Sequence, residues 1–188
     1  MKKIIDEILT DLSAKPHDDL EKLPFGCGIY AIYLVTDAML PAGCFLAESR
    51  GRCIYVGKAE KSLQRRDLRI HFTDNRTGSS TLRRSLGAIF RQTWGLHLVP
   101  RRVPPRLKID VRNFAFEEDD EQRLTKWMKN NLKIKTWKNL ARLDLKQIEE
   151  GLTEELKPVL NLTGWENPRK EEIKKLRAEC RELAREHG

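Results

Sequence analysis

Long hydrophobic runs are missing from this sequence of 188 residues. The longest uncharged run, residues 23–36, is shorter than the about 20 residues of a membrane-spanning helix, and Pro24 and two glycines interrupt it. Near the start of the chain, Asp6, Glu7 and Asp11 interrupt any hydrophobic region of a secretory signal. We therefore expect a cytoplasmic protein with no membrane-spanning segment.

Cysteine is also scarce, and its spacing argues against two further classes of protein. The four cysteines, Cys27, Cys44, Cys53 and Cys180, form no CxxC pair. The sequence therefore indicates neither a zinc cage nor a disulfide framework. We expect reduced thiols, most of them buried.

Positive charge, by contrast, is in excess and is concentrated in one segment. The formal net charge is +8, and residues 50–106 hold fourteen Lys and Arg against three acidic residues, so this segment carries +11 and the rest −3. Such a basic segment indicates a surface that binds a polyanion, because Lys and Arg near phosphates release condensed counterions. The alternative is a solvated basic surface without a specific ligand.

Hydrophobic periodicity predicts a small mixed sheet with helices packed against it. Residues 99–105 contain three prolines and are expected to form a loop. Strands are expected at residues 28–35, 52–57, 109–116 and 133–138, and helices at 2–14, 61–72, 117–132, 144–157, after the cap at 79–81 and after Pro168.

Two triplets lie in the first two expected strands: Gly28-Ile29-Tyr30 and Tyr55-Val56-Gly57. Side chains alternate along a strand, so each glycine shares a face with the tyrosine of its triplet. If the strands pair, two phenols and two positions without a side chain lie together and leave room for a ligand near the backbone. The alternative is that these are ordinary strand tyrosines.

A group of cations follows the second triplet. Lys58 comes directly after it, and residues 63–66 (LQRR) and then His71 lie on an expected helix. A helix that begins this soon after the strand can direct cations toward the place that the tyrosines face. A basic surface helix is the alternative.

Glu149 is placed by helical geometry. At about 100° per residue from Leu145, Leu152 falls at roughly −20°, Leu156 at roughly +20° and Glu149 at roughly +40°, whereas Glu150 points away. An ionised carboxylate on an apolar face must be paired or bind a metal, since its desolvation otherwise costs several kcal/mol. A structural salt bridge with a nearby arginine is the alternative.

Taken together, these three clusters resemble the GIY-YIG nuclease family. That family has a GIY strand, a YIG strand, an Arg on the following helix, often a His after it, and a metal-binding Glu on a later helix that ends in Pro and Asn. In this sequence the two triplets are followed by Arg66, three residues beyond Leu63, and by the closing pattern of Glu149, Leu152, Leu156, Pro158 and Asn161.

The resemblance implies an α/β (α+β) fold with a small, mostly antiparallel central sheet flanked by helices. It implies a nuclease domain at residues 23–162, between an N-terminal helix and linker (1–22) and a C-terminal helix (163–188). It also implies a metal-dependent endonuclease that hydrolyses phosphodiester bonds in DNA, with RNA left open, and that uses Mg²⁺ or Mn²⁺.

By the same resemblance, Glu149 holds a single divalent metal, Tyr30 is the general base and Tyr55 positions the water or the phosphate. A phenol with a pKa of about 10 is a poor base at neutral pH, so Arg66 and Lys58 are expected to favour the phenolate and to stabilise charge on the phosphate.

Asn161 is expected to hold the site together. The remaining arginines are expected to contact the nucleic-acid backbone, which gives affinity without sequence choice. These arginines are Arg65, Arg69, Arg76, Arg83, Arg84, Arg91, Arg101, Arg102 and Arg106.

Four features depart from the family pattern. The gap between the triplets is long, which predicts an inserted loop near residues 38–51. Arg65 and Arg66 are adjacent and both are candidates for the catalytic arginine, with Arg66 preferred by its distance to Leu63. His71, a further candidate for the catalytic set, follows Arg66 by five residues where the family more often has four, and the segment 91–143 is long for the family.

Two other functions fit the same sequence. One is a non-catalytic nucleic-acid-binding module that retains the nuclease fold. The other is a protein-interaction domain that uses the amphipathic helices at residues 2–14 and 168–187 as contact surfaces.

Overall fold

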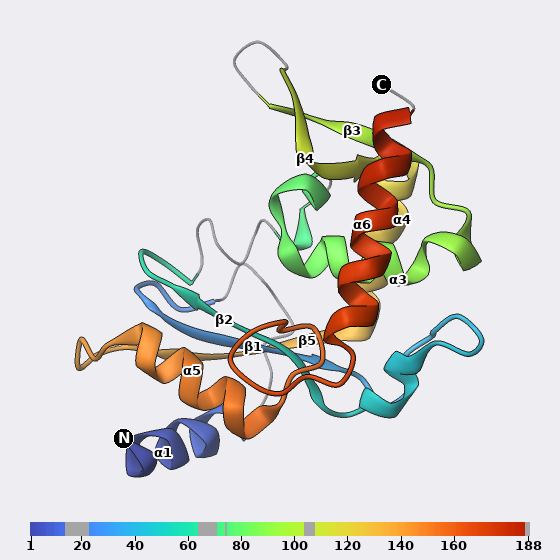
Figure 1. Cartoon of the computed structure of the whole chain (residues 1–188). Helices are drawn as coiled ribbons and strands as arrows, with labels where there is room; N and C mark the ends of the chain where they lie inside the picture. The colour runs from blue at the N-terminus through green and yellow to red at the C-terminus, as the bar shows by residue number, and fades with distance from the viewer. Residues whose placement is uncertain (14–22, 64–70, 74, 104–107, 187–188) are drawn as a thin grey trace. The chain divides into compact units, whose positions relative to one another are not determined.

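The computed structural model describes residues 1–13, 23–63, 71–73, 75–103 and 108–186, without the side chains of 13, 102, 103 and 108–111 (Figure 1). The chain divides into two compact units. Unit 1 comprises residues 1–40, 45–69 and 130–168, and unit 2 comprises residues 41–44, 70–129 and 169–188. The domain boundaries expected at residues 22 and 162 stay a prediction.

Unit 1 is built on a three-stranded antiparallel sheet in the order β2-β1-β5. The central strand β1 (Gly28–Leu34) pairs with β2 (Cys53–Ala59) and with β5 (Leu132–Lys138). The sheet and its helices confirm the predicted α/β (α+β) class with a small antiparallel central sheet.

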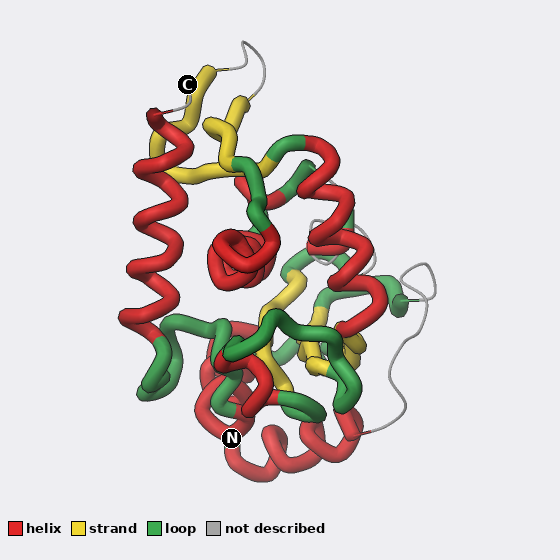
Figure 2. The backbone as a smooth tube through the Cα atoms, turned by 90° about the vertical axis from the view of Figure 1, so that its right-hand side faces the viewer, coloured by secondary structure: helices red, strands yellow, loops and turns green. Residues whose placement is uncertain are grey.

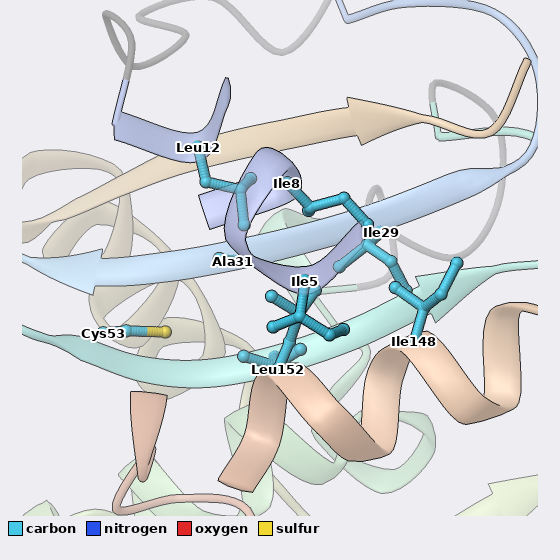
Figure 3. Close-up of a cluster of buried hydrophobic side chains, with 9 residues drawn as sticks. Ile5, Ile8, Leu12, Ile29, Ala31, Cys53, Ile148 and Leu152 are labelled. Atoms are coloured by element: carbon cyan, nitrogen blue, oxygen red, sulfur yellow. The ribbon is translucent and has the colours of Figure 1, made fainter. Parts of the chain in front are cut away.

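One face of this sheet is covered by α1 (Lys2–Ser13) and α5 (Leu145–Leu156). Figure 3 shows the apolar side chains of both helices directed toward β1 and β2. The apolar side chains of α1 therefore belong to the core, where full burial of one Ile or Leu stabilises the fold by about 1.5–3 kcal/mol. The buried cluster comprises Ile5, Ile8, Leu12, Ile29, Ala31, Cys53, Val56, Ile148 and Leu152.

Both ends of α5 are determined by local chemistry. The side chain of Asp144 accepts hydrogen bonds from the backbone of Lys146 and Gln147, as an N-cap does. At the other end Lys157 adopts the left-handed conformation with φ 46°, and Pro158 follows. The predicted helix that ends before Pro158 is therefore confirmed, and its position along β2 is well defined.

Unit 2 contains a two-stranded antiparallel sheet and the helices η3 (Thr77–Ser79), α3 (Thr81–Trp94) and α6 (Lys170–Glu186). It also contains α4 (Glu118–Asn131) except for its last two residues, which belong to unit 1. The sheet pairs β3 (Leu98–Val103) with β4 (Lys108–Phe116), and α6 packs beside it (Figure 2).

The prediction of a loop at residues 99–105 is wrong for residues 99–103, which belong to β3. Pro100 is tolerated in β3 because this strand has one partner and the pairing shifts its register between Pro100 and Arg101. Residues 104–107 lie outside the described residues.

The helix predicted at 61–72 is only partly described. Residues 61–63 are not helical and residues 64–70 lie outside the described residues. The inserted segment before β2 includes a short helix, η2 (Phe45–Ser49).

All four cysteines are free thiols, and Cys53 and Cys180 are buried. Among the described residues, no helix is both long and apolar enough to cross a bilayer.

Candidate active site

The ring of Tyr30 lies over the backbone of Gly57. The two residues are direct cross-strand partners, and a Cβ atom built on Gly57 would lie 2.4 Å from both Cζ and Oη of Tyr30. Real Cβ atoms do not approach other atoms this closely, so the ring occupies the space that a side chain at residue 57 would need. The glycine of one triplet therefore determines where the tyrosine of the other lies.

Tyr55 lies on the same face of the sheet as Tyr30. It pairs with Ile32, and the rings of Tyr30 and Tyr55 are stacked with centroids 6.3 Å apart. Gly28 allows a second close approach, because its Cβ would lie 2.1 Å from the carbonyl oxygen of Trp137. The two triplets thus meet as the sequence predicts.

The opposite face of β2 carries Lys58, and α5 brings Glu149 to it. The Lys58 Nζ atom lies 3.9 Å from a carboxylate oxygen of Glu149, and each side chain is between a quarter and a third exposed. Burial raises the pKa of Glu149 above its ordinary value, while the charge of Lys58 and a hydrogen bond from the Lys58 backbone oppose the rise. The carboxylate is only loosely paired and is turned partly toward the protein, as its position on the helix predicts.

Glu149 opens into a pocket of about 280 Å³. Gly57 and Lys58 are consecutive in β2 and so point to opposite faces of the sheet, which places the two tyrosines across this strand from the pocket. The pocket is lined by Lys58, Lys146, Glu149, Glu150, Thr153, Asn161, Thr163 and Gly164.

The side chain of Asn161 makes two hydrogen bonds to the outer edge of β2. Its Oδ1 accepts a hydrogen bond of 2.9 Å from the Val56 amide, and its Nδ2 donates one of 2.9 Å to the Val56 carbonyl. The neighbouring Leu160 amide donates to the Ile54 carbonyl at 2.9 Å. A side-chain amide here replaces a missing strand, which satisfies the edge and fixes β2 beside the pocket.

Further hydrogen bonds from the segment after Asn161 fix the backbone around this residue, and the sequence did not predict them. Trp165 Nε1 donates to the carbonyls of Pro158 and Asn161, and Asn167 Nδ2 donates to those of Val159 and Asn161. The sequence signal that was missed is the run GWEN at residues 164–167, which begins three residues after the closing Asn and contains the two side-chain donors.

Four further predicted site residues fall into two groups. Arg65, Arg66 and Arg69 lie outside the described residues. His71 belongs to unit 2, is 6 % exposed, and its Nδ1 lies 2.7 Å from Ser80 Oγ. Burial, with smaller contributions from the charges of two arginines, lowers the pKa of His71 to about 4. Its ring is engaged inside unit 2, so we leave it out of the proposed catalytic set.

The expected backbone-contacting arginines of unit 2 also differ in exposure. Arg83 is completely buried, so the exposed position expected for it is wrong, because Glu121 from α4 pairs with it at 2.6 Å. Arg76 is exposed, and Arg84, Arg91 and Arg101 are partly exposed. The side chains of Arg102 and Arg106 are outside the described residues.

The pocket suits a hard divalent cation. Magnesium takes oxygen ligands and keeps several waters, so one or two carboxylates suffice for it in a protein site. Glu149 supplies a half-buried carboxylate, and Thr153 and Thr163 line the same pocket. Within the described part of the chain no cluster of three or more His, Cys, Asp or Glu side chains offers an alternative all-protein cage.

The comparisons with known proteins identify the family of this chain. The sequence model of the GIY-YIG catalytic domain matches residues 28–183. Neither the comparison with curated proteins nor that with solved structures finds a significant match. The matched segment covers most of the chain and includes both tyrosine-bearing strands, the Glu149 helix and Asn161, so this chain belongs to the GIY-YIG catalytic domain family.

Proposed function

We propose that this protein is a metal-dependent endonuclease that hydrolyses phosphodiester bonds in DNA at the site formed by β1, β2 and α5. Membership of the family implies nuclease activity and a nucleic-acid substrate. The observation that supports this site best is Glu149, a half-buried and loosely paired carboxylate that opens into a pocket directly beside β2.

In this proposal Glu149 and waters hold one divalent cation, Mg²⁺ or Mn²⁺. The cation supplies charge stabilisation to the phosphate and orients it. Lys58 adds positive charge at the same pocket, where it favours binding of the phosphate and offsets the charge that develops on its oxygens.

Tyr30 is proposed as the general base. Its Oη would take a proton from the attacking water, and the ring is held for this task by its position over Gly57. Tyr55, stacked beside it, positions the water or the phosphate. Arg66, which lies outside the described residues, is proposed to stabilise the phenolate and the phosphate. Asn161 keeps β2 in place without moving a proton.

The test is cleavage of supercoiled plasmid by the full chain in MgCl₂ or MnCl₂. Glu149→Gln should lower the rate of nicking by roughly 10³-fold, and Tyr30→Phe by at least roughly 10²-fold, because each removes a group that acts in the transition state. Chelation of the metal should stop the reaction. The matched control is Glu154→Gln, which removes an exposed carboxylate from the same helix and should leave the rate unchanged.

Nicking that survives both Glu149→Gln and Tyr30→Phe would remove this site from the explanation. Tight, salt-dependent binding of DNA with no cleavage in any divalent metal would instead favour a non-catalytic binding module.

A further inference from the structure

Three charged side chains of unit 1 meet at the end of β2. Lys58 is near the end of this strand, Glu60 follows directly after it, and Glu149 comes from α5. The Lys58 Nζ atom lies 3.4 Å from a carboxylate oxygen of Glu60 and 3.9 Å from one of Glu149. One ammonium group is therefore shared between two carboxylates that are far apart in the sequence.

The two carboxylates reach Lys58 from different surroundings. The Glu149 side chain is 28 % exposed and lines the pocket together with Lys58. The Glu60 side chain is 72 % exposed and lies outside the described lining of the pocket. The ammonium group can thus be held from inside the pocket by Glu149 or from the solvent side by Glu60.

A divalent cation at Glu149 would compete with Lys58 for this carboxylate. The two charges have the same sign, so a cation bound there repels an ammonium group that lies 3.9 Å from a Glu149 oxygen. Lysine has a flexible stem of four carbons and three donors, which lets its ammonium turn to another acceptor. Glu60 is the nearer of the two acceptors and can keep the ammonium beside the pocket.

The formal charges around the pocket fit this role. The pocket is lined by two lysines and two glutamates, whose charges cancel: Lys58, Lys146, Glu149 and Glu150. Glu60 gives this group a net charge of −1, which attracts a divalent cation. The bound cation then makes the net charge +1, which attracts a phosphate.

We infer that Glu60 is a positioning residue that holds the Lys58 ammonium beside the pocket when a divalent cation binds Glu149. This inference rests on the proposed function and adds to it the residue that lets the lysine and the cation act together. Glu60 itself touches neither the cation nor the phosphate. Its effect on cation binding should therefore pass through Lys58.

The test is binding of Mn²⁺ to the full chain without substrate, with the free ion measured by electron paramagnetic resonance. Glu149→Gln should abolish binding, which assigns the ion to this pocket. Lys58→Met removes the competing charge and should tighten Kd about tenfold. Glu60→Gln leaves Lys58 with Glu149 alone and should weaken Kd about fivefold, the upper range for a partly exposed ion pair.

A double-mutant cycle shows whether Glu60 acts through Lys58. In the Lys58→Met background, Glu60→Gln should change Kd by less than about twofold. The matched control is Glu150→Gln. The charge of Glu150, like that of Glu60, raises the pKa of Glu149, but Glu150 pairs with Lys146 at 3.9 Å. Its effect on Kd should therefore be nearly the same in both backgrounds.

Equal weakening by Glu60→Gln in both backgrounds would overturn the inference, because Glu60 would then act only as a distant charge. Unchanged Kd in Glu60→Gln alone would overturn it as well. Lys58→Arg keeps a cation at this position and should keep the effect of Glu60→Gln, which separates a lost ion pair from a damaged fold.

The same measurements distinguish a failure of this inference from a failure of the proposed function. Plasmid nicking together with Mn²⁺ binding that shows no coupling between Glu60 and Lys58 would overturn the role of Glu60 alone. Coupled Mn²⁺ binding without nicking would overturn the proposed hydrolysis alone. A chain that binds no Mn²⁺ would overturn both.

Discussion

Each unit contains an ion pair between a basic residue and a glutamate, and the two pairs differ in distance and in burial. In unit 1, Lys58 and Glu149 are 3.9 Å apart, and their side chains are 27 % and 28 % exposed. In unit 2, Arg83 and Glu121 are 2.6 Å apart and both side chains are completely buried. Each glutamate lies on a helix and each cation belongs to the basic segment, but only one pair is open to a ligand.

The buried pair is satisfied from all sides. The Arg83 guanidinium donates to Thr77, Thr125, Glu121 and the His71 carbonyl. A buried charge must be satisfied in this way, because an unpaired one costs several kcal/mol. Glu149 is less completely paired, and its raised pKa reflects a carboxylate whose burial outweighs its stabilising contacts. Underpaired groups of this kind reduce stability and favour ligand binding.

The largest effect on stability is expected from Glu121→Gln. This change leaves the Arg83 charge buried without its carboxylate, so the free energy of unfolding of the protein should fall by about 3–5 kcal/mol. Chemical denaturation followed by far-UV circular dichroism measures it.

The control for this prediction is Glu171→Gln on α6, which removes an exposed partner of Lys174. Exposed pairs contribute at most about 1 kcal/mol. Equal destabilisation by both variants would contradict the difference between buried and open pairs.

A smaller effect is expected in unit 1 from Gly57→Ala, and it concerns activity. The new Cβ atom would displace the Tyr30 ring, which lies 2.4 Å from that position. Misplacement of a catalytic group by about 1 Å costs roughly 10²-fold in rate, so plasmid nicking should slow by about that factor.

A double-mutant cycle separates this effect from a general disturbance of the strand. In the Tyr30→Phe background, Gly57→Ala should cause little further loss, because the group that it displaces no longer acts as a base. Full additivity of the two losses would show that Gly57 serves something other than the placement of Tyr30.

The smallest effect is a dependence of stability on pH, with opposite signs in the two units. In unit 2 burial lowers the pKa of His71 from 6.5 to about 4, so the folded state binds fewer protons than the unfolded state between these values. The contribution of His71 is complete above pH 6.5 and is lost as the pH falls toward 4. It should amount to roughly 2 kcal/mol between pH 7 and pH 5, and His71→Gln should abolish it.

Glu149 acts in the other direction. Its pKa is raised by burial, so the folded state binds a proton more readily, and the free energy of unfolding falls as the pH rises from the ordinary value of 4.5 toward the folded value. Comparison of the wild type with Glu149→Gln and His71→Gln over pH 4–8 isolates the two contributions. A common sign for both would contradict the comparison of the units.

Much of unit 1 was predictable because its signals are local. Alternating Ile, Val and Tyr predict β1 and β2, and the 3.6-residue period predicts α1 and α5 together with the inward turn of Glu149. That the tyrosines and glycines of the two triplets lie together was predicted for paired strands, whereas the register that sets Tyr30 opposite Gly57 comes from the structure. The hydrogen bonds between Asn161 and Val56 join residues 105 positions apart, and only the family resemblance indicated that Asn161 holds the site together.

Unit 2 was predicted less well because its decisive contacts are distant in sequence. The cap expected within residues 79–81 is confirmed and is Ser80, whose contact with the Arg83 amide spans three residues. The first turn of α4 holds four acidic residues, and nothing local distinguishes Glu121, which is buried, from Glu118, which is exposed. The sequence did not predict β3, because the prolines in this segment indicated a loop. Pairing with β4 overrides that local preference.

The sequence by itself determined the order and type of most elements, the two tyrosine triplets, the facing of Glu149 and the family, because these depend on spacing along the chain. Only the tertiary structure decided which cations are exposed. Arg83 and Arg84 are adjacent on α3 and chemically identical, yet Glu121 of α4 pairs with the buried Arg83, while Arg84 stays partly exposed. The burial of a charge depends on which distant segment covers it, and spacing along the chain contains no such information.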